Sequence, residues 1–280
     1  MKDADKTKIL KYMVLTQIKG LGAVSQKALL NICGNIENCF DAGYDDLIKA
    51  DGERLIGRKR MESFTDQRND KELWDRAEAI LQLSGSLEIN VITYEDIVFP
   101  DRLRNIKDVP VVLYAKGTLK INSYRESIGV VGARRCTTEG KRLAIDTATM
   151  AVTANAAVIS GMAKGIDSYA HTAAIKSNGY TISVLGNGVD ICYPKEHEKL
   201  YAEIAEHGCI LSEYPPGTPP REYNFPKRNR LIAGLSDKLY VIDAGRNSGA
   251  LSTVDHSKEY GRKVIMCGET VLHNDENGEE

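Results

Sequence analysis

A short basic segment is the part of the sequence whose residue types and spacing suggest chemistry most directly. Residues 225–230 read Phe-Pro-Lys-Arg-Asn-Arg. Pro226 favours the first turn of a helix. Lys227, Arg228 and Arg230 would then stand near the positive end of the helix dipole, where cations are unfavourable. Because such conflicts concentrate at functional sites and a bound polyanion would relieve this one, we predict that the segment binds phosphate groups. The alternative is a solvated basic turn.

The connection that leads into this segment supports the same interpretation. It runs from Tyr214 to Phe225, twelve residues with four prolines, which is long for a loop inside a compact sheet and favours a binding loop. Phe225 is one of four phenylalanines in the chain. Its ring could stack on a nucleic-acid base, or it could instead fill a gap in the core.

A second basic turn follows the apolar run that ends at Val131. Gly132, Ala133 and Arg134 lead toward a helix, so a glycine frees the backbone beside a helix N-terminus and a guanidinium stands next to it. This combination suits one phosphate. The turn is neither a dinucleotide fingerprint nor a phosphate-binding P-loop, because Lys141 precedes an arginine where the P-loop needs Ser or Thr.

A third turn follows the run that ends at residue 159. Ser160 and Gly161 begin it, and Lys164 in the turn is better explained as a phosphate contact than as a catalytic base. Asp167 and His171 stand four residues apart and would share a helix face, so a nucleophile with its base is an alternative. We discount that alternative because Ser160 lacks the Gly-x-Ser-x-Gly elbow, and an Asp at a helix start is usually an N-cap.

Composition limits the function classes. With 37 basic against 39 acidic residues, a histone-like polycation is excluded, so any anion site must be local. Six cysteines are scattered singly, which indicates reduced thiols and no metal site. No run approaches the length of a membrane helix, and the first eleven residues lack a signal peptide's apolar core, so we expect a soluble cytoplasmic protein.

The elements that position these turns are predicted by hydrophobic periodicity. Apolar residues at helical spacing predict a helical domain over residues 1–85. Within it, the two glycines Gly20 and Gly22 resemble a helix-hairpin-helix turn, whose amide groups can hold a DNA phosphate, although a plain packing turn is equally consistent. Residues 86–270 predict an α/β domain, and residues 271–280 form an acidic tail.

The α/β domain is predicted to be doubly wound. Short Val/Ile/Leu runs alternate with amphipathic segments, which is typical of a mostly parallel, Rossmann-like sheet with helices on both faces. Ligands of such folds lie outside the carboxyl ends of the strands, where the three turns stand. The apolar runs cover residues 127–131, 156–159, 181–185, 209–211, 239–242 and 263–266.

Taken together, these motifs resemble the DNA-processing protein A (DprA, also called Smf) family over roughly residues 90 to 268. The helical front end resembles the sterile-alpha-motif-like (SAM-like) domain that many members carry. Three departures are visible: Ala133 stands where the family usually has Ser, Cys267 precedes Gly268 where Pro is usual, and the winged-helix domain of some members is missing. The motifs that carry the resemblance are Val131–Arg134, Ser160–Asp167 with Ala170-His171, Tyr193-Pro194, Ser212-Glu213, Phe225–Arg230 with Ala233–Ser236, and Ser248-Gly249.

The resemblance implies a homodimeric mediator that binds single-stranded DNA and delivers it to the recombinase RecA during natural transformation. It implies no enzymatic activity, no cofactor and no metal. Two alternatives stay open: a nucleotide-cleaving enzyme with Asp167 or Glu213 as acid or base, and a nucleotide sensor. Carried over by position, the DNA-binding residues would be Gly132, Ala133, Arg134, Ser160, Gly161, Lys164, Phe225, Lys227, Arg228, Asn229, Arg230 and Ser248.

Overall fold

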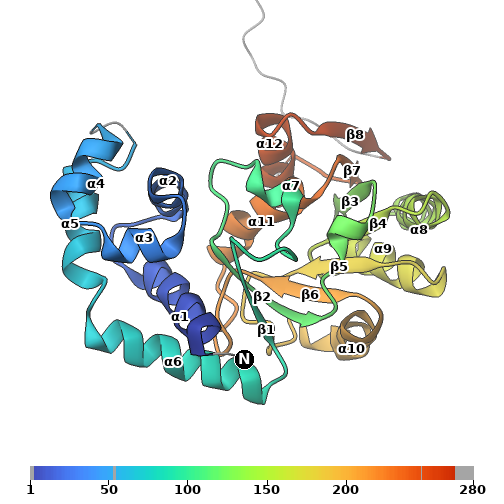
Figure 1. The fold of residues 1–280 in the computed structure, drawn as a ribbon. Helices are drawn as coiled ribbons and strands as arrows, with labels where there is room; N and C mark the ends of the chain where they lie inside the picture. The colour runs from blue at the N-terminus through green and yellow to red at the C-terminus, as the bar shows by residue number, and fades with distance from the viewer. Residues whose placement is uncertain (1–2, 53–54, 247, 269–280) are drawn as a thin grey trace, which may run out of the picture.

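The chain begins with a helical domain, followed by a mixed sheet covered on both faces (Figure 1). The computed structural model describes residues 3–52, 55–246 and 248–268. The predicted tail at 271–280 lies outside these residues. The helices of the first domain are α1 (Asp3–Gln17), α2 (Ala23–Cys33), α3 (Ile36–Asp41), α4 (Tyr44–Asp51), α5 (Arg58–Gln67) and α6 (Lys71–Ser86).

The apolar core of the helical domain continues into the sheet, where it includes Val112, Tyr114 and Ile210. Met13, Leu29 and Phe64 are fully buried, and Phe64 meets Phe40 edge to face with ring centroids 5.7 Å apart. The side chain of Asp70 caps α6 by accepting from the backbone N–H of Glu72 at 2.8 Å. The predicted boundary at residue 85 falls in the last turn of α6, and the independence of the two domains stays a prediction.

The sheet has eight strands in the order β1-β2-β6-β5-β4-β3-β7-β8. β2 runs antiparallel to both of its neighbours, and the other pairings are parallel. The predicted doubly wound, mostly parallel sheet is therefore confirmed, and each predicted run lies within one residue of its strand at both ends. The strands are β1 (Asn90–Thr93), β2 (Val112–Gly117), β3 (Ser127–Gly132), β4 (Ala157–Ser160), β5 (Thr181–Val184), β6 (Cys209–Ser212), β7 (Lys238–Ile242) and β8 (Lys263–Cys267).

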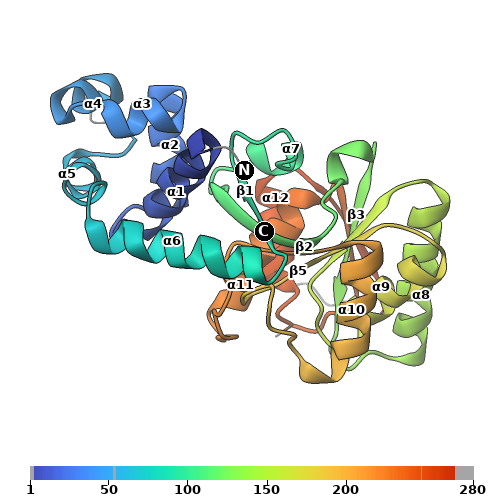
Figure 2. The same cartoon turned by 60° about the horizontal axis from the view of Figure 1, so that its bottom comes forward.

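The helices cover the sheet from two sides because the strands are apolar on both faces. Ile128 and Val130 pack with alanines of α8 and α9, whereas Val131 packs with Leu231 and Leu235 of α11. Figure 2 shows α8, α9 and α10 gathered on one side, away from α11 and α12. The helices are α7 (Asp101–Arg104), α8 (Thr138–Thr153), α9 (Ile166–Lys176), α10 (Glu198–His207), α11 (Asn224–Leu235) and α12 (Leu251–Glu259).

The two domains are joined by a polar network at the β1 edge of the sheet. Glu95, just after β1, accepts from the hydroxyl of Tyr12 at 2.6 Å, from Nζ of Lys8 at 2.6 Å and from the backbone N–H of Ile36 at 2.9 Å. These three donors come from α1 and α3. The helical domain is thus held against the sheet by a carboxylate with three partners.

No helix among the described residues is long and apolar enough to span a membrane.

Candidate nucleic-acid interface

A cavity of about 770 Å³ opens at the carboxyl ends of the central strands, where the fold predicts a ligand. Its walls come from the turns after β3, β4 and β7 and from the starts of α11 and α12. A smaller cavity of about 70 Å³, lined by Gly161 and Lys164, adjoins it and shares Arg134, Phe225 and Arg228 with it. Of the predicted site residues, Gly132, Ala133, Arg134, Phe225, Arg228, Asn229 and Ser248 line the larger cavity.

The turns after β3 and β4 pack tightly against each other. The backbone N–H of Ile166 donates to the carbonyl of Ala133 at 3.2 Å. A Cβ added to Gly165 would lie 2.3 Å from that same carbonyl oxygen, and Gly165 has φ +77°, so only glycine fits there without strain. This packing fixes the backbone next to Arg134. The side chain of Arg134 is exposed at the cavity, with no carboxylate at ion-pair distance in the part of the chain that the structure describes.

Arg228 is buried, whereas the sequence predicted an exposed cation that is free to bind a phosphate. Its side chain is 5% exposed, and Nη1 donates to the carbonyls of Gly161, at 2.9 Å, and Val184. The guanidinium lies so close to Gly161 that an added Cβ would meet three of its atoms at 2.8–2.9 Å. Burial lowers the pKa of Arg228 to about 10, so the group keeps its charge at neutral pH. Gly161 is therefore required by the arginine that packs on it.

Arg230 also differs from its predicted role. Nη1 and Nη2 both donate to the carboxylate of Glu213 at 2.7 Å, and Nε lies 3.1 Å from Asp108. Burial alone would lower the pKa of Arg230, but these two carboxylates raise it. The expectation that an external polyanion relieves the cationic helix start is wrong for Arg228 and Arg230. Carbonyls and carboxylates of the protein itself accept hydrogen bonds from the two guanidinium groups and balance their charge. A buried guanidinium needs such partners, because it is otherwise too costly to remove from water.

Of three further predicted residues, two do not line either of these cavities, and the third, Lys164, lines the smaller one but has an ion-pair partner. Ser160 is fully buried and donates to the carbonyl of Val130 at 2.6 Å, so it ties β4 to β3 and does not reach the cavity. Lys164 forms an ion pair with Glu196, both side chains being more than half exposed. Such surface pairs are weak, so Lys164 can exchange this partner for a phosphate. Lys227 is exposed but faces a different cavity.

An aromatic pair stands at the cavity mouth. The rings of Tyr193 and Phe225 are stacked with centroids 5.5 Å apart, and Tyr193 is 44% exposed. Gly186 makes room for this pair, because an added Cβ would lie 2.9 Å from the Phe225 ring. Phe225 is partly buried and packs on Tyr193, and its role in stacking a nucleic-acid base stays a prediction. An exposed aromatic face next to cations can stack a nucleic-acid base.

Asn229 and Ser248 shape the cavity wall between α11 and α12. The side-chain amide of Asn229 donates to the carbonyl of Gly249 at 3.0 Å and to the hydroxyl of Ser252 at 2.7 Å, while its oxygen accepts from Nε of Arg228. Ser248 is partly exposed, and its hydroxyl accepts from the N–H of Ala250 at 3.3 Å. The side-chain amide of Asn229 is fully engaged by neighbouring groups, whereas the Ser248 hydroxyl donates to no group in the part of the chain that the structure describes.

Asp167 and His171 lie below the cavity in an arrangement that is not a catalytic triad. Asp167 accepts from the backbone N–H groups of Gly161 and Ala163, so it braces the preceding turn and does not cap its own helix as predicted. Burial raises the pKa of Asp167, and the charge of Arg228 opposes this. The Thr181 hydroxyl donates to Val158, so it accepts from Nδ1–H of His171 at 2.7 Å. Among the described residues His171 makes no hydrogen bond to Ser160, so the two are not arranged as a base and its nucleophile.

Two residues that line the cavity are not among the DNA-binding residues expected from the sequence. Tyr193 follows β5, and Arg246 follows β7 and is exposed, with no carboxylate at ion-pair distance among the described residues. The signal for Arg246 was its place in the loop after a parallel strand, next to Gly245. For Tyr193 the signal was the Tyr193-Pro194 motif, which belongs to the family resemblance.

The sequence is similar to a known family and to individual members of it. The model of the family described as DNA recombination-mediator protein A matches residues 90–280. The protein Smf of Synechocystis sp. is 36% identical over 260 residues, 91% of this chain and 63% of its own length. The DNA processing protein DprA of Bacillus subtilis is 34% identical over 212 residues, 76% of this chain and 71% of its own. The chain thus spans under two thirds of the Synechocystis relative.

Two solved structures are similar to this one. The crystal structure of DprA from Streptococcus pneumoniae is 29% identical with a TM-score of 0.73, and the match covers 98% of this chain and 89% of that one. A DprA structure from Helicobacter pylori, described for its single-stranded DNA binding mode, is 30% identical with a TM-score of 0.59 over 64% of this chain and 81% of that one. The family match extends over more than half of the sequence and includes the whole cavity. The chain therefore belongs to the DNA recombination-mediator protein A (DprA/Smf) family.

Proposed function

We propose that this chain binds single-stranded DNA in the cavity at the carboxyl ends of the strands. One observation carries the proposal: the unpaired guanidinium of Arg134 and the exposed face of the Tyr193–Phe225 pair line the same cavity. A cation beside a stacking surface is the usual way to hold a single strand without reading its sequence. The Helicobacter pylori relative, described for its binding of single-stranded DNA, supports the same ligand.

The proposal includes a cellular role. The chain acts in the cytoplasm as a homodimer that protects incoming single strands and loads RecA on them, and it is not an enzyme. The family's description as a recombination mediator supports this role. It is tested by measuring RecA filament formation on strands precoated with a single-strand binding protein, with and without this chain, and by sedimentation of the chain alone. Absence of any acceleration of RecA assembly would overturn the loading role.

DNA binding is tested with two neighbouring arginines. Arg134 lines the cavity, whereas Arg135 is equally exposed and does not. Loss of one charge-assisted hydrogen bond of about 1.5–3 kcal/mol corresponds to a weakening of roughly ten- to a hundredfold. We expect Arg134→Ala to weaken oligo-dT binding by this factor in fluorescence anisotropy, and Arg135→Ala to change it less than about twofold. Equal affinities for both variants, or preferred binding of duplex DNA, would refute the proposal.

The nucleotide-cleaving alternative has one observation in its favour. Asp167 lines the cavity, and burial raises its pKa, a combination that is common for catalytic acids. Against it, Asp167 already accepts two backbone hydrogen bonds, and Glu213 is held by Arg230. Incubation with nucleoside monophosphates and oligonucleotides tests it: turnover that disappears in Asp167→Asn would establish the enzyme, and no turnover would remove it.

A further inference from the structure

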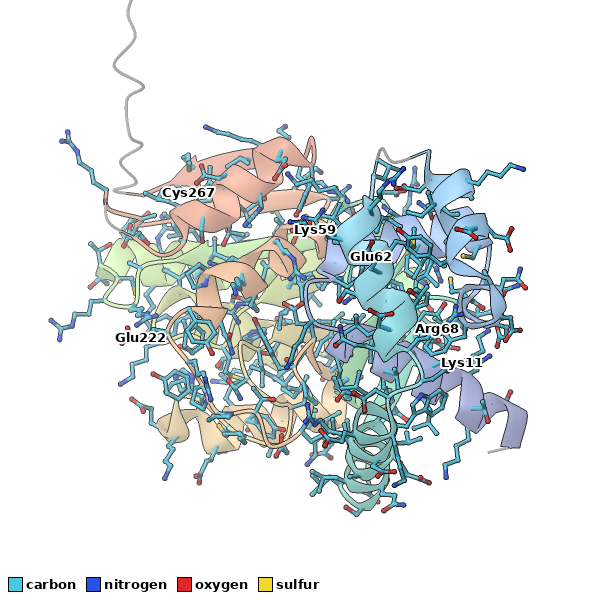
Figure 3. The ribbon with its side chains drawn as sticks, turned by 90° about the vertical axis from the view of Figure 1, so that its left-hand side faces the viewer. Lys11, Lys59, Glu62, Arg68, Glu222 and Cys267 are labelled. Carbon is cyan, nitrogen blue, oxygen red and sulfur yellow. The ribbon has the colours of Figure 1, made fainter. Side chains whose placement is uncertain are left out.

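A second, larger cavity lies between the two domains. It has a volume of about 1220 Å³, above the roughly 300–1,000 Å³ of ordinary small-molecule sites, so it suits a segment of polymer better than a metabolite. We call it the interdomain groove. Figure 3 views the molecule from the side of the helical domain and labels Lys59 at the start of α5 and Glu222 just before α11. One wall is formed by Gly20, Gly22–Ser25 and Arg60; the other includes Asp108, Glu213, Tyr214, Pro216–Pro219, Arg221, Tyr223, Lys227, Arg230 and His256.

The groove carries a net positive charge. Its two carboxylates, Asp108 and Glu213, are both engaged by Arg230. Arg60, Arg221 and Lys227 are exposed, and none of them has a carboxylate within 4.0 Å among residues 3–52, 55–246 and 248–268. Three unpaired cations on opposite walls of one groove favour an anionic ligand.

An exposed tyrosine stands between two of these cations. Tyr223 is 55% exposed, with the guanidinium of Arg221 at 6.0 Å and Nζ of Lys227 at 5.4 Å from its ring centroid. The Tyr223 hydroxyl accepts from Arg221 at 2.9 Å, which holds the pair in place. A ring flanked by cations at the surface is a platform on which a base can stack while its phosphates meet the charges.

The opposite wall contributes the glycine turn between α1 and α2. Gly20 has φ +82°, and Gly22 caps α2 without a side-chain hydrogen bond. The side chain of Gln26 donates to the carbonyl of Leu21 at 2.8 Å and keeps the turn in shape. Nothing lies within 4 Å of a Cβ built on either glycine, so the turn is open toward the groove and adds backbone donors to the cations.

The groove continues the first cavity. Pro226 lines both, and Asn224 and Lys227 beside it face the groove while Phe225 and Arg228 face the first cavity. A strand that leaves the first cavity across the start of α11 therefore enters the groove directly. The groove's width is fixed, because Nζ of Lys27 donates to the carbonyls of Arg104 and Ile106, at 2.9 Å each, across the domain junction.

From these observations we infer that the interdomain groove binds the continuation of the single strand held in the first cavity, so that the helical domain is part of the DNA-binding surface. This inference rests on the proposed function and extends it: the first cavity holds a few nucleotides, and the groove the next ones along the strand. Binding should therefore strengthen with length until both are filled, and the added affinity should depend on residues of the helical domain.

The test compares two charge reversals in the first turn of α5. Arg60 lines the groove, and Lys59 is exposed but does not. An acidic residue at this end of a helix agrees with the helix dipole, so both variants should fold. Affinity of the full chain is measured for oligo-dT of about 6 nucleotides, within the site of about 4–16 nucleotides usual for one binding module, and of about 20 nucleotides, beyond it. Thermal unfolding of both variants serves as the folding control.

We expect Arg60→Glu to weaken binding of the long strand by about tenfold at low salt and to leave the short strand unchanged, because only the long strand reaches the groove. Lys59→Glu should affect neither length. Equal long-strand affinities for Arg60→Glu and Lys59→Glu would overturn the inference, as would a duplex that binds the groove more tightly than the strand. If the wild-type chain fails to bind the short strand, the proposed function itself fails, which is a distinct result.

Discussion

Four arginines in the turns and helix starts near the cavity differ in burial, although all four stand in similar places in the sequence, after a strand or at a helix start. Arg228 and Arg230 are buried in the first turns of α11, bound to carbonyls and carboxylates, whereas Arg134 and Arg246 are exposed at the cavity. A buried guanidinium whose N–H groups donate to the protein can hold the shape of a site, but it has few N–H groups free to donate to a phosphate. The comparison separates arginines that build the cavity from arginines that meet its ligand, and the following variants test that division.

The largest effect is expected from Arg228. Replacing it with Met removes the donor for Gly161 and Val184 and leaves Asp167 buried beside an apolar side chain. A buried acceptor left without its donor costs about 1–3 kcal/mol, and three acceptors lose theirs, the carbonyls of Gly161 and Val184 and the amide oxygen of Asn229, so we expect a loss of about 3–5 kcal/mol in urea unfolding. Arg134→Met, the exposed counterpart, should change the free energy of unfolding by less than about 0.5 kcal/mol. Equal stabilities would break the division into two groups.

The next effect concerns the bidentate pair of Arg230. Arg230→Met strands Glu213 and Asp108 without their cation and should cost about 3 kcal/mol. The double variant Arg230→Met/Glu213→Gln should recover part of this loss, because the uncompensated carboxylate is removed as well. If the loss of stability in the double variant equals the sum of the losses in Arg230→Met and Glu213→Gln, the two residues are not coupled, which would contradict this account.

A smaller effect is expected from His171, on how the free energy of unfolding changes with pH. Burial, followed by the charges of His197 and Arg228, lowers the pKa of His171 to about 3. The unfolded chain then binds a proton that the folded chain does not, so stability falls as pH drops from about 6.5 toward 3, by about 1.4 kcal/mol per unit. Asp167, whose pKa is raised, acts in the opposite sense. We expect His171→Gln to fall less steeply than the wild type in acid unfolding curves, and parallel curves would contradict this.

Sequence patterns predicted the fold well because the relevant signals are local. The run at 127–131 identified β3, and Pro226 lies in the first turn of α11 as predicted. The sequence patterns also predicted the edge of the sheet at which the candidate cavity opens, since parallel strands place their carboxyl ends together.

The partners of the buried cations could not be predicted in the same way. Arg230 pairs with Glu213, which lies 17 residues earlier, and with Asp108, more than a hundred residues away. Arg228 binds backbone carbonyls, which carry no sequence signal. A basic cluster at a helix start is therefore ambiguous until the tertiary contacts are known, and the interdomain groove depends on two segments that only folding brings together.

The division of the arginines is tested most directly by the salt dependence of oligo-dT binding. The slope of log K against log salt counts the phosphates that cations neutralise, at about 0.7 per contact for single strands. We predict that Arg134→Ala lowers the magnitude of this slope by about 0.7, whereas Arg230→Met leaves it unchanged even if the affinity falls. A lower slope in Arg230→Met together with an unchanged slope in Arg134→Ala would contradict the account.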